Sequence, residues 1–152
     1  MKIAWIYLDI KSAAVCALRD FPIMEHIIQT HQDNTRQLRA HLTSVNMPRL
    51  SGLPKKPNPR AAENKIAMTL DLIDVVEEKY YQALEYMAWF CPAWAEMSDE
   101  EQLILSAFCQ WDDVTKAEVI QRLGDHLGLE KTAVYTRKDK AASHLGFLLY
   151  GK

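Results

Sequence analysis

The segment from Lys131 to Lys140 has the side-chain chemistry best suited to binding a ligand. Four of its residues are basic and one is acidic, so its net charge is near +3. Basic side chains offset the charge of nucleic-acid phosphates. Hydroxyl groups lie among them and can hydrogen-bond to base edges or to phosphates. The segment therefore has the composition of a DNA-contacting surface, although a solvated helix face with lysines has the same composition.

The pattern around this segment predicts two short helices joined by a tight turn. The first helix carries apolar residues at helical spacing, namely Val119, Ile120, Leu123 and Leu127. Gly128 follows them, and glycine ends a helix at low cost because it tolerates positive φ. A second helix is predicted to begin near residues 130–132 and to extend to residue 145 (helix 131–145). Its inward positions are Val134, Ala141 and Leu145. Two helices joined in this way form a helix-turn-helix, whose second helix can enter a DNA major groove.

The chain from residue 97 to about residue 150 resembles region four of bacterial sigma factors. It is more similar still to small phage-encoded transcriptional regulators whose C-terminal half is sigma-region-four-like. Ser98 and Glu101 form a Ser-x-x-Glu cap before a Leu-Ile-Leu helix, and the middle helix ends in Leu-Gly. The last helix reads Thr-x-Val-Tyr near its start. The resemblance implies a DNA-binding transcription regulator of phage type that also contacts RNA polymerase or a promoter-bound partner.

The resemblance also implies roles for individual residues. Base contacts fall at the start of the last helix, on Lys131, Thr132, Tyr135 and Thr136. We expect phosphate contacts from Lys116, Arg137, Lys138 and Lys140. Two positions depart from the family pattern. Arg137 stands where an apolar residue is usual, which bears on the packing register of the helix. Thr136 stands where arginine or glutamine is usual, which bears on the base preference.

Composition indicates a folded, mostly helical chain of one or two small domains. The 152 residues are 49% hydrophobic and include only 5 glycines and 6 prolines. The net charge of −2 is unevenly distributed. Residues 1–62 contain nine bases and four acids, for a net charge of +5. Residues 63–112 contain two bases and eleven acids (−9), and residues 113–152 contain seven bases and five acids (+2). The acidic middle should avoid DNA; it is either a solvated face or a surface for a basic protein partner.

We predict an all-α fold in four parts. These are an N-terminal helical region (1–43), a Pro-rich basic linker (44–60), a long helix with an aromatic junction (61–96) and the sigma-region-four-like helix-turn-helix domain (97–152). Pro22 is predicted to separate two helices in the first part, with a further break near residues 31–35. Pro92 is predicted to end the long helix after Cys91.

The long helix carries an apolar seam with a repeat near 3.5 residues. The seam residues are Ile66, Leu70, Ile73, Tyr80, Leu84 and Met87. The seam can pair with the N-terminal helices or with a second copy of the chain. The aromatic residues Trp89, Phe90, Trp94 and Trp111 could stack on bases, but such groups more often hold subdomains together.

Several chemistries have no support in the sequence. It contains no nucleophile elbow, P-loop, dinucleotide fingerprint or metal-ligand spacing, so we expect no enzyme activity, cofactor or metal. Cys16, Cys91 and Cys109 form no Cys-x-x-Cys pair and are expected to be buried thiols in a cytoplasmic protein. No apolar run is long enough for a membrane span. Two alternatives to DNA binding stay open: a helical adaptor that uses the sigma-like domain for protein contacts, and a homodimeric scaffold.

Overall fold

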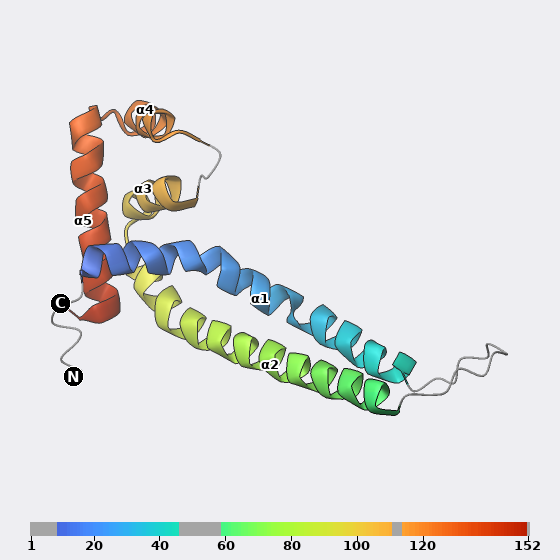
Figure 1. Cartoon of the computed structure of the whole chain (residues 1–152). Coiled ribbons are helices and arrows are strands. Elements are labelled where there is room, and N and C mark those ends of the chain that lie inside the picture. Colours follow the sequence, from blue (N-terminus) through green and yellow to red (C-terminus); the bar gives the residue numbers. More distant parts are fainter. Residues whose placement is uncertain (1–8, 46–58, 111–113, 152) are drawn as a thin grey trace. The chain divides into compact units, whose positions relative to one another are not determined.

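The computed structural model describes residues 9–45, 59–110 and 114–151, and these ranges contain helices and no strands (Figure 1). The helices are α1 (Ile10–Val45), α2 (Pro59–Glu96), α3 (Asp99–Gln110), α4 (Lys116–Leu127) and α5 (Lys131–Tyr150). The predicted all-α fold is therefore confirmed. None of the described helices is both long enough and apolar enough to cross a membrane. Most of the predicted linker (46–58) and Trp111 lie outside the described residues.

The chain groups into two compact units. The first consists of Met1–Ile23 and Tyr86–Lys152, and the second of Met24–Glu85. These units are defined by contacts between segments that are far apart in the sequence, whereas the predicted four parts are consecutive segments of the chain. The four-part division therefore stays a prediction.

The first unit has two neighbouring hydrophobic clusters. One joins the start of α1 and the end of α2 to α3 and α5; its buried members include Leu18, Phe90, Met97, Leu105, Leu145 and Leu149. Phe90 is fully buried, and its ring stacks on those of Tyr86 and Trp94, with centroids 5.3 and 5.8 Å away. The expectation that aromatic residues join parts of the chain is confirmed for Phe90 and Trp94. Trp89 is exposed, and its Nε1 donates a hydrogen bond to the Leu149 carbonyl oxygen at 3.3 Å.

The other cluster holds α3, α4 and α5 together. Its buried members are Ile104, Ala107, Val119, Ile120, Leu123 and Val134. Leu127 and Leu129 pack against it from the end of α4 and the turn that follows. The helical spacing of these residues gives each helix one apolar face, and burial of those faces fixes α4 and α5 against α3.

The second unit is a hairpin of residues 24–45 of α1 and 59–85 of α2. The Tyr80 ring stacks on His31, with centroids 3.9 Å apart and planes 12° from parallel. Ile73 is buried between the helices, so the predicted seam does pair with the N-terminal helix of the same chain. Leu70 and Leu84 were predicted to lie in this seam, but both are exposed. They sit to one side of it, because a straight helix does not keep a 3.5-residue repeat on a single line.

The helix breaks predicted at proline were wrong. Pro22 lies inside α1 and Pro92 inside α2, and α1 also continues through residues 31–35. Both prolines are exposed, so their rings point away from the packed faces. Around Pro92 the buried residues Phe90, Ala93 and Met97 keep helical spacing without interruption. Burial of that face outweighs the single backbone hydrogen bond that proline removes.

Two further expectations need correction. The last helix does not stop at residue 145 but runs to Tyr150, passing through Gly146. Gly146 is packed against the first turn of α1, where a Cβ would come within 2.1 Å of Ile10 Cγ2. Of the three thiols, Cys109 is buried as predicted, whereas Cys16 and Cys91 are exposed.

Candidate nucleic-acid interface

Helices α3 and α4 both begin with a capping box. In the predicted one, the Ser98 backbone N–H donates to Glu101 Oε2 at 3.0 Å, and the Glu101 N–H donates to Ser98 Oγ at 3.3 Å. The second box pairs Thr115 with Glu118 at 3.3 and 3.4 Å. Its signal in the sequence is the same Ser/Thr-x-x-Glu spacing, which sequence reasoning missed at this position. Both boxes fix where their helices start.

The turn between α4 and α5 is closed by two glycines. Gly128 has φ 65° and ψ 35°, the left-handed conformation predicted for it, and its N–H donates to the Gly124 carbonyl oxygen. The Leu129 N–H donates to the same oxygen at 2.9 Å. The side chain of Leu129 then packs into the apolar cluster, and α5 begins at Lys131 after Glu130. The predicted helix-turn-helix is therefore present.

Helix α5 has the predicted inward face. Val134, Ala141 and Leu145 are buried, so Arg137 does not disturb the packing register. The opposite side carries Thr132, Thr136 and Asp139, which are exposed and separated by four and three residues. We call these three residues the outer ridge of α5. Asp139 gives this ridge a negative charge.

All four predicted base-facing residues, Lys131, Thr132, Tyr135 and Thr136, are exposed. Two of them have contacts that limit what they can do. Tyr135 leans on Phe108 of α3, with ring centroids 6.2 Å apart. Thr136 Oγ1 donates a hydrogen bond to the Thr132 carbonyl oxygen at 3.0 Å, so its hydroxyl is set to accept, not donate, on the outside.

The four predicted phosphate-contacting residues separate into two pairs. Arg137 forms an ion pair with Glu100 of α3. Lys138 lies with Nζ 4.7 Å from the centroid of the Phe108 ring, a cation–π arrangement. Lys116 and Lys140 are exposed and have no ion pair with any described residue. Lys116 stands at the first position of α4, where the helix dipole also attracts anions. The structure thus leaves Lys116 and Lys140 as the more available phosphate ligands.

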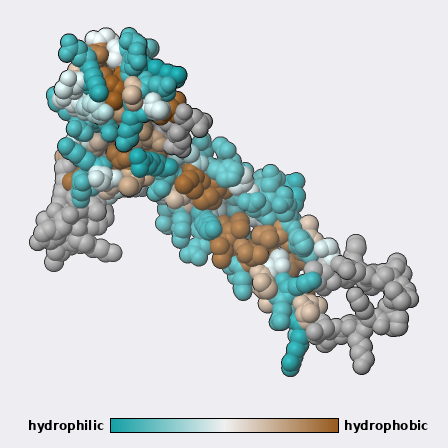
Figure 2. Space-filling model, turned by 45° about the horizontal axis from the view of Figure 1, so that its top comes forward, coloured by the Kyte–Doolittle hydropathy of each residue, from teal (hydrophilic) through white to brown (hydrophobic). Residues whose placement is uncertain are grey.

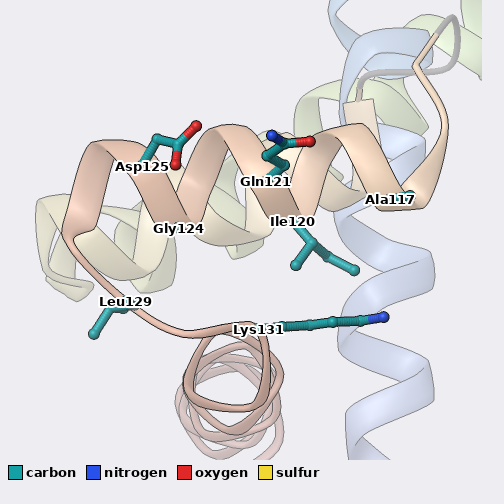
Figure 3. Close-up of a pocket in the computed structure, with 7 residues that line it drawn as sticks. All are labelled: Ala117, Ile120, Gln121, Gly124, Asp125, Leu129 and Lys131. Atoms are coloured by element: carbon teal, nitrogen blue, oxygen red, sulfur yellow. The ribbon is translucent and has the colours of Figure 1, made fainter.

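A shallow depression of about 360 Å³ lies between α4 and the start of α5 (Figure 3). Its lining residues are Ala117, Ile120, Gln121, Gly124, Asp125, Leu129 and Lys131. In Figure 3 the extended side chain of Lys131 lies below Ile120, while Gln121 and Asp125 project from the far side of α4. The ammonium, amide and carboxylate groups of this lining can form hydrogen bonds with a ligand.

A second groove, of about 420 Å³, lies between the start of α3 and the middle of α5. Glu101, which also caps α3, lies in this groove, and its Oε1 is 3.0 Å from Nδ1 of His144. Burial raises the pKa of Glu101, but hydrogen bonds from the Ser98 backbone and from His144 outweigh it, so the pKa lies below its usual value. The Glu101 carboxylate links α5 to α3, and it also accepts a hydrogen bond from Ser98 Oγ at 3.1 Å.

No group of histidine, cysteine or acidic side chains within the described ranges could hold a metal ion. No protein-family model matches the chain, and the comparisons with curated proteins and with solved structures also give no match. The resemblance to sigma region four therefore depends on the residues quoted above and stays a prediction.

Proposed function

We propose that the protein is a sequence-specific DNA-binding transcription regulator of phage type, which docks the start of α5 in a major groove. The observation that supports this most is the exposed start of α5 directly after the left-handed turn at Gly128. Lys131, Thr132 and Tyr135 project there from a helix whose other side is buried. A recognition helix requires this arrangement, because its base-reading side chains must protrude from a rigid support.

The charges favour a modest phosphate contribution. Lys116, Lys131 and Lys140 are available, whereas Arg137 is already paired within the protein. Asp139 opposes phosphate on the outer ridge. Non-specific binding should therefore be weak at physiological salt, and the affinity for the operator should depend strongly on direct base contacts.

The proposal includes a protein partner, RNA polymerase or another transcription protein with a basic surface. The acidic part of the chain supports it, because the acids of α2 lie on its exposed surface; they include Asp71, Asp74, Glu78 and Glu85. Such a surface repels DNA and attracts a basic protein. Its charge should therefore raise the rate at which the basic partner protein associates with this chain at low salt.

The test starts from selection of bound duplexes out of a random DNA library, followed by titration of the selected duplex across salt concentrations. The double variant Lys131→Ala, Lys140→Ala should bind about tenfold or more weakly and have a salt slope shallower by about 2. The control double variant Arg36→Ala, Arg60→Ala removes the same charge from exposed positions of the second unit and should bind like the parent.

The second candidate function is a helical adaptor that binds protein and not DNA. It is favoured by one observation, that Arg137 and Lys138 are held by Glu100 and Phe108 instead of projecting outward. If no duplex is selected and no salt-dependent binding occurs at low salt, the DNA-binding proposal is wrong and the adaptor is favoured.

A further inference from the structure

The hairpin of the second unit buries little apolar surface. Among its described residues only Thr35, Ile73 and Ala83 are buried. Large apolar side chains of α2 are exposed on it instead, and Figure 2 shows hydrophobic surface gathered along the hairpin. Two helices cannot cover their apolar faces alone, and the usual solution is a bundle in which a second pair of helices packs on the first.

The exposed apolar residues of α2 lie in two stripes, one on each side of the line that faces α1. One stripe is Met68, Leu72 and Val75, which are 46–66% exposed. The other is Leu70, Tyr81 and Leu84. Spacings of three, four and seven residues place Met68, Leu72 and Val75 on one side of the helix. Leu70, Tyr81 and Leu84 share the other side, because their spacings of 3, 11 and 14 residues are also close to whole helical turns.

The two sides differ in charge. The side of Leu70 also carries Asp74 and the Arg39–Glu77 ion pair, whose charged atoms are 3.9 Å apart. The side of Leu72 borders a groove of about 310 Å³, lined by Asn34, Gln37, Leu38, His41, Leu72 and Val76. A neighbouring groove on that side, of about 220 Å³, adds one charged residue, Lys79. The exposed residues one helical turn from Met68 and Val75 carry charges of both signs, namely Lys65, Asp71, Glu78 and Lys79.

We propose that the side of Leu72 is a homodimer interface, where two hairpins pack as an antiparallel four-helix bundle. We call it the dimer face and define it by Met68, Leu72, Val75, Leu38 and Asn34. A second copy fits because a two-fold interface must be complementary to itself. Apolar side chains meet this condition, and so do amides such as Asn34, which both donate and accept hydrogen bonds. A face dominated by charges of one sign would repel its own copy.

The charges at the edge of this face also suit a two-fold arrangement. If Leu72 of one copy lies opposite Val75 of the other, Lys79 lies opposite Met68 of the second copy, within one helical turn of its Asp71. Both Lys79 and Asp71 are exposed, and no ion pair joins either one to a described residue. The two-fold axis repeats the pairing, so that two Lys79–Asp71 contacts flank the apolar centre.

The test measures the mass of the full chain in solution by light scattering and sedimentation across a wide range of protein concentration. The parent should have twice the chain mass of 17.5 kDa. Leu72→Asn should weaken the dimer by about tenfold or more, because it places an amide in the apolar centre. Leu70→Asn, on the opposite side, is the matched control and should leave the mass unchanged.

A charge exchange tests the arrangement without altering the apolar centre. Lys79→Glu alone and Asp71→Lys alone should each weaken the dimer by about tenfold, since each places like charges together twice. The double variant Lys79→Glu, Asp71→Lys should restore the affinity of the parent.

A parent that stays at the mass of one chain at every concentration would overturn the inference. The dimer face would then be covered by another part of the chain or by another protein. A dimer that Leu70→Asn dissociates and Leu72→Asn does not would also overturn it, as would failure of the double charge variant to restore association. Because the readout is mass, the result is independent of whether the chain binds DNA.

Discussion

The carbonyl oxygen of Leu129 lies where a side chain on Gly124 would begin. A Cβ built on Gly124 would be 2.8 Å from that oxygen, while the Leu129 N–H donates to the Gly124 carbonyl oxygen at 2.9 Å. The chain after the turn therefore lies against α4 only because residue 124 has no side chain. This contact sets the path from α4 into α5, and with it the position of the exposed residues at the start of α5.

Gly124→Ala should lower the free energy of unfolding by about 1–2 kcal/mol, since overpacking against backbone outweighs the better helix propensity of alanine. The variant should also bind the selected DNA more weakly, because the start of α5 must shift. Chemical denaturation and duplex titration measure the two effects. Asp125→Ala, at the exposed neighbouring position, is the control and should change the stability by less than about 0.5 kcal/mol. An unchanged stability for Gly124→Ala would show that the turn relaxes freely.

Glu101 makes the stability of the first unit depend on acid pH. Its pKa in the folded protein lies below the usual 4.5, because hydrogen bonds from Ser98 and His144 outweigh the effect of burial. A lowered folded-state pKa contributes stability that is present above the unfolded-state pKa and is lost as pH falls through the folded-state pKa.

Glu101→Gln should therefore lower the free energy of unfolding at pH 7 by about 1 kcal/mol, and its difference from the parent should disappear as pH falls through the lowered folded-state pKa of Glu101. Denaturation curves between neutral and acid pH measure this. Asp99→Asn removes a neighbouring exposed acid from the same helical turn and is the control, and it should have a smaller effect at pH 7. A difference for Glu101→Gln that persists at acid pH would mean that its charge is not what stabilises the contact.

The sequence predicted the local features that depend on one or two neighbouring residues. Ser98 and Glu101 form a capping box and Gly128 takes a left-handed conformation, because these preferences arise from the backbone itself. The inward face of α5 was also predictable, since the spacing of Val134, Ala141 and Leu145 leaves one arrangement.

Features that depend on tertiary packing could not be predicted in this way. Pro92 weakens a helix locally, yet the buried face that runs through Phe90 and Ala93 holds the helix together. The partners of Arg137 and Lys138, Glu100 and Phe108, lie on another helix, so the sequence did not reveal that these bases are occupied. Helical spacing says which residues share a face, but not which helix covers that face.

Thr35 is a buried polar residue in the hairpin of the second unit. Its Oγ1 is buried without a hydrogen-bond partner among the described residues. Thr35→Val replaces the hydroxyl with a methyl group of similar size, so it should raise the free energy of unfolding by about 1 kcal/mol. Thr43→Val at an exposed position, where Oγ1 donates to the Arg39 carbonyl oxygen at 2.9 Å, should give no gain. A loss of stability in Thr35→Val would indicate that a water molecule satisfies the hydroxyl.

Asp139 offers the most direct test of how α5 faces DNA. It lies on the outer ridge with Thr132 and Thr136, so under the proposed function its carboxylate opposes the phosphates beside the groove. Asp139→Asn removes that repulsion without changing the size of the side chain. Binding to the selected duplex should tighten by roughly threefold to tenfold at low salt, and the gain should shrink as salt screens the charge.

The control is Asp33→Asn, which changes an exposed aspartate of the second unit. It makes the same change in net charge and should have no effect on DNA binding if the contact of Asp139 is local. An equal gain from both variants would show that only net charge matters, and no gain from Asp139→Asn would place the DNA on a different face of α5.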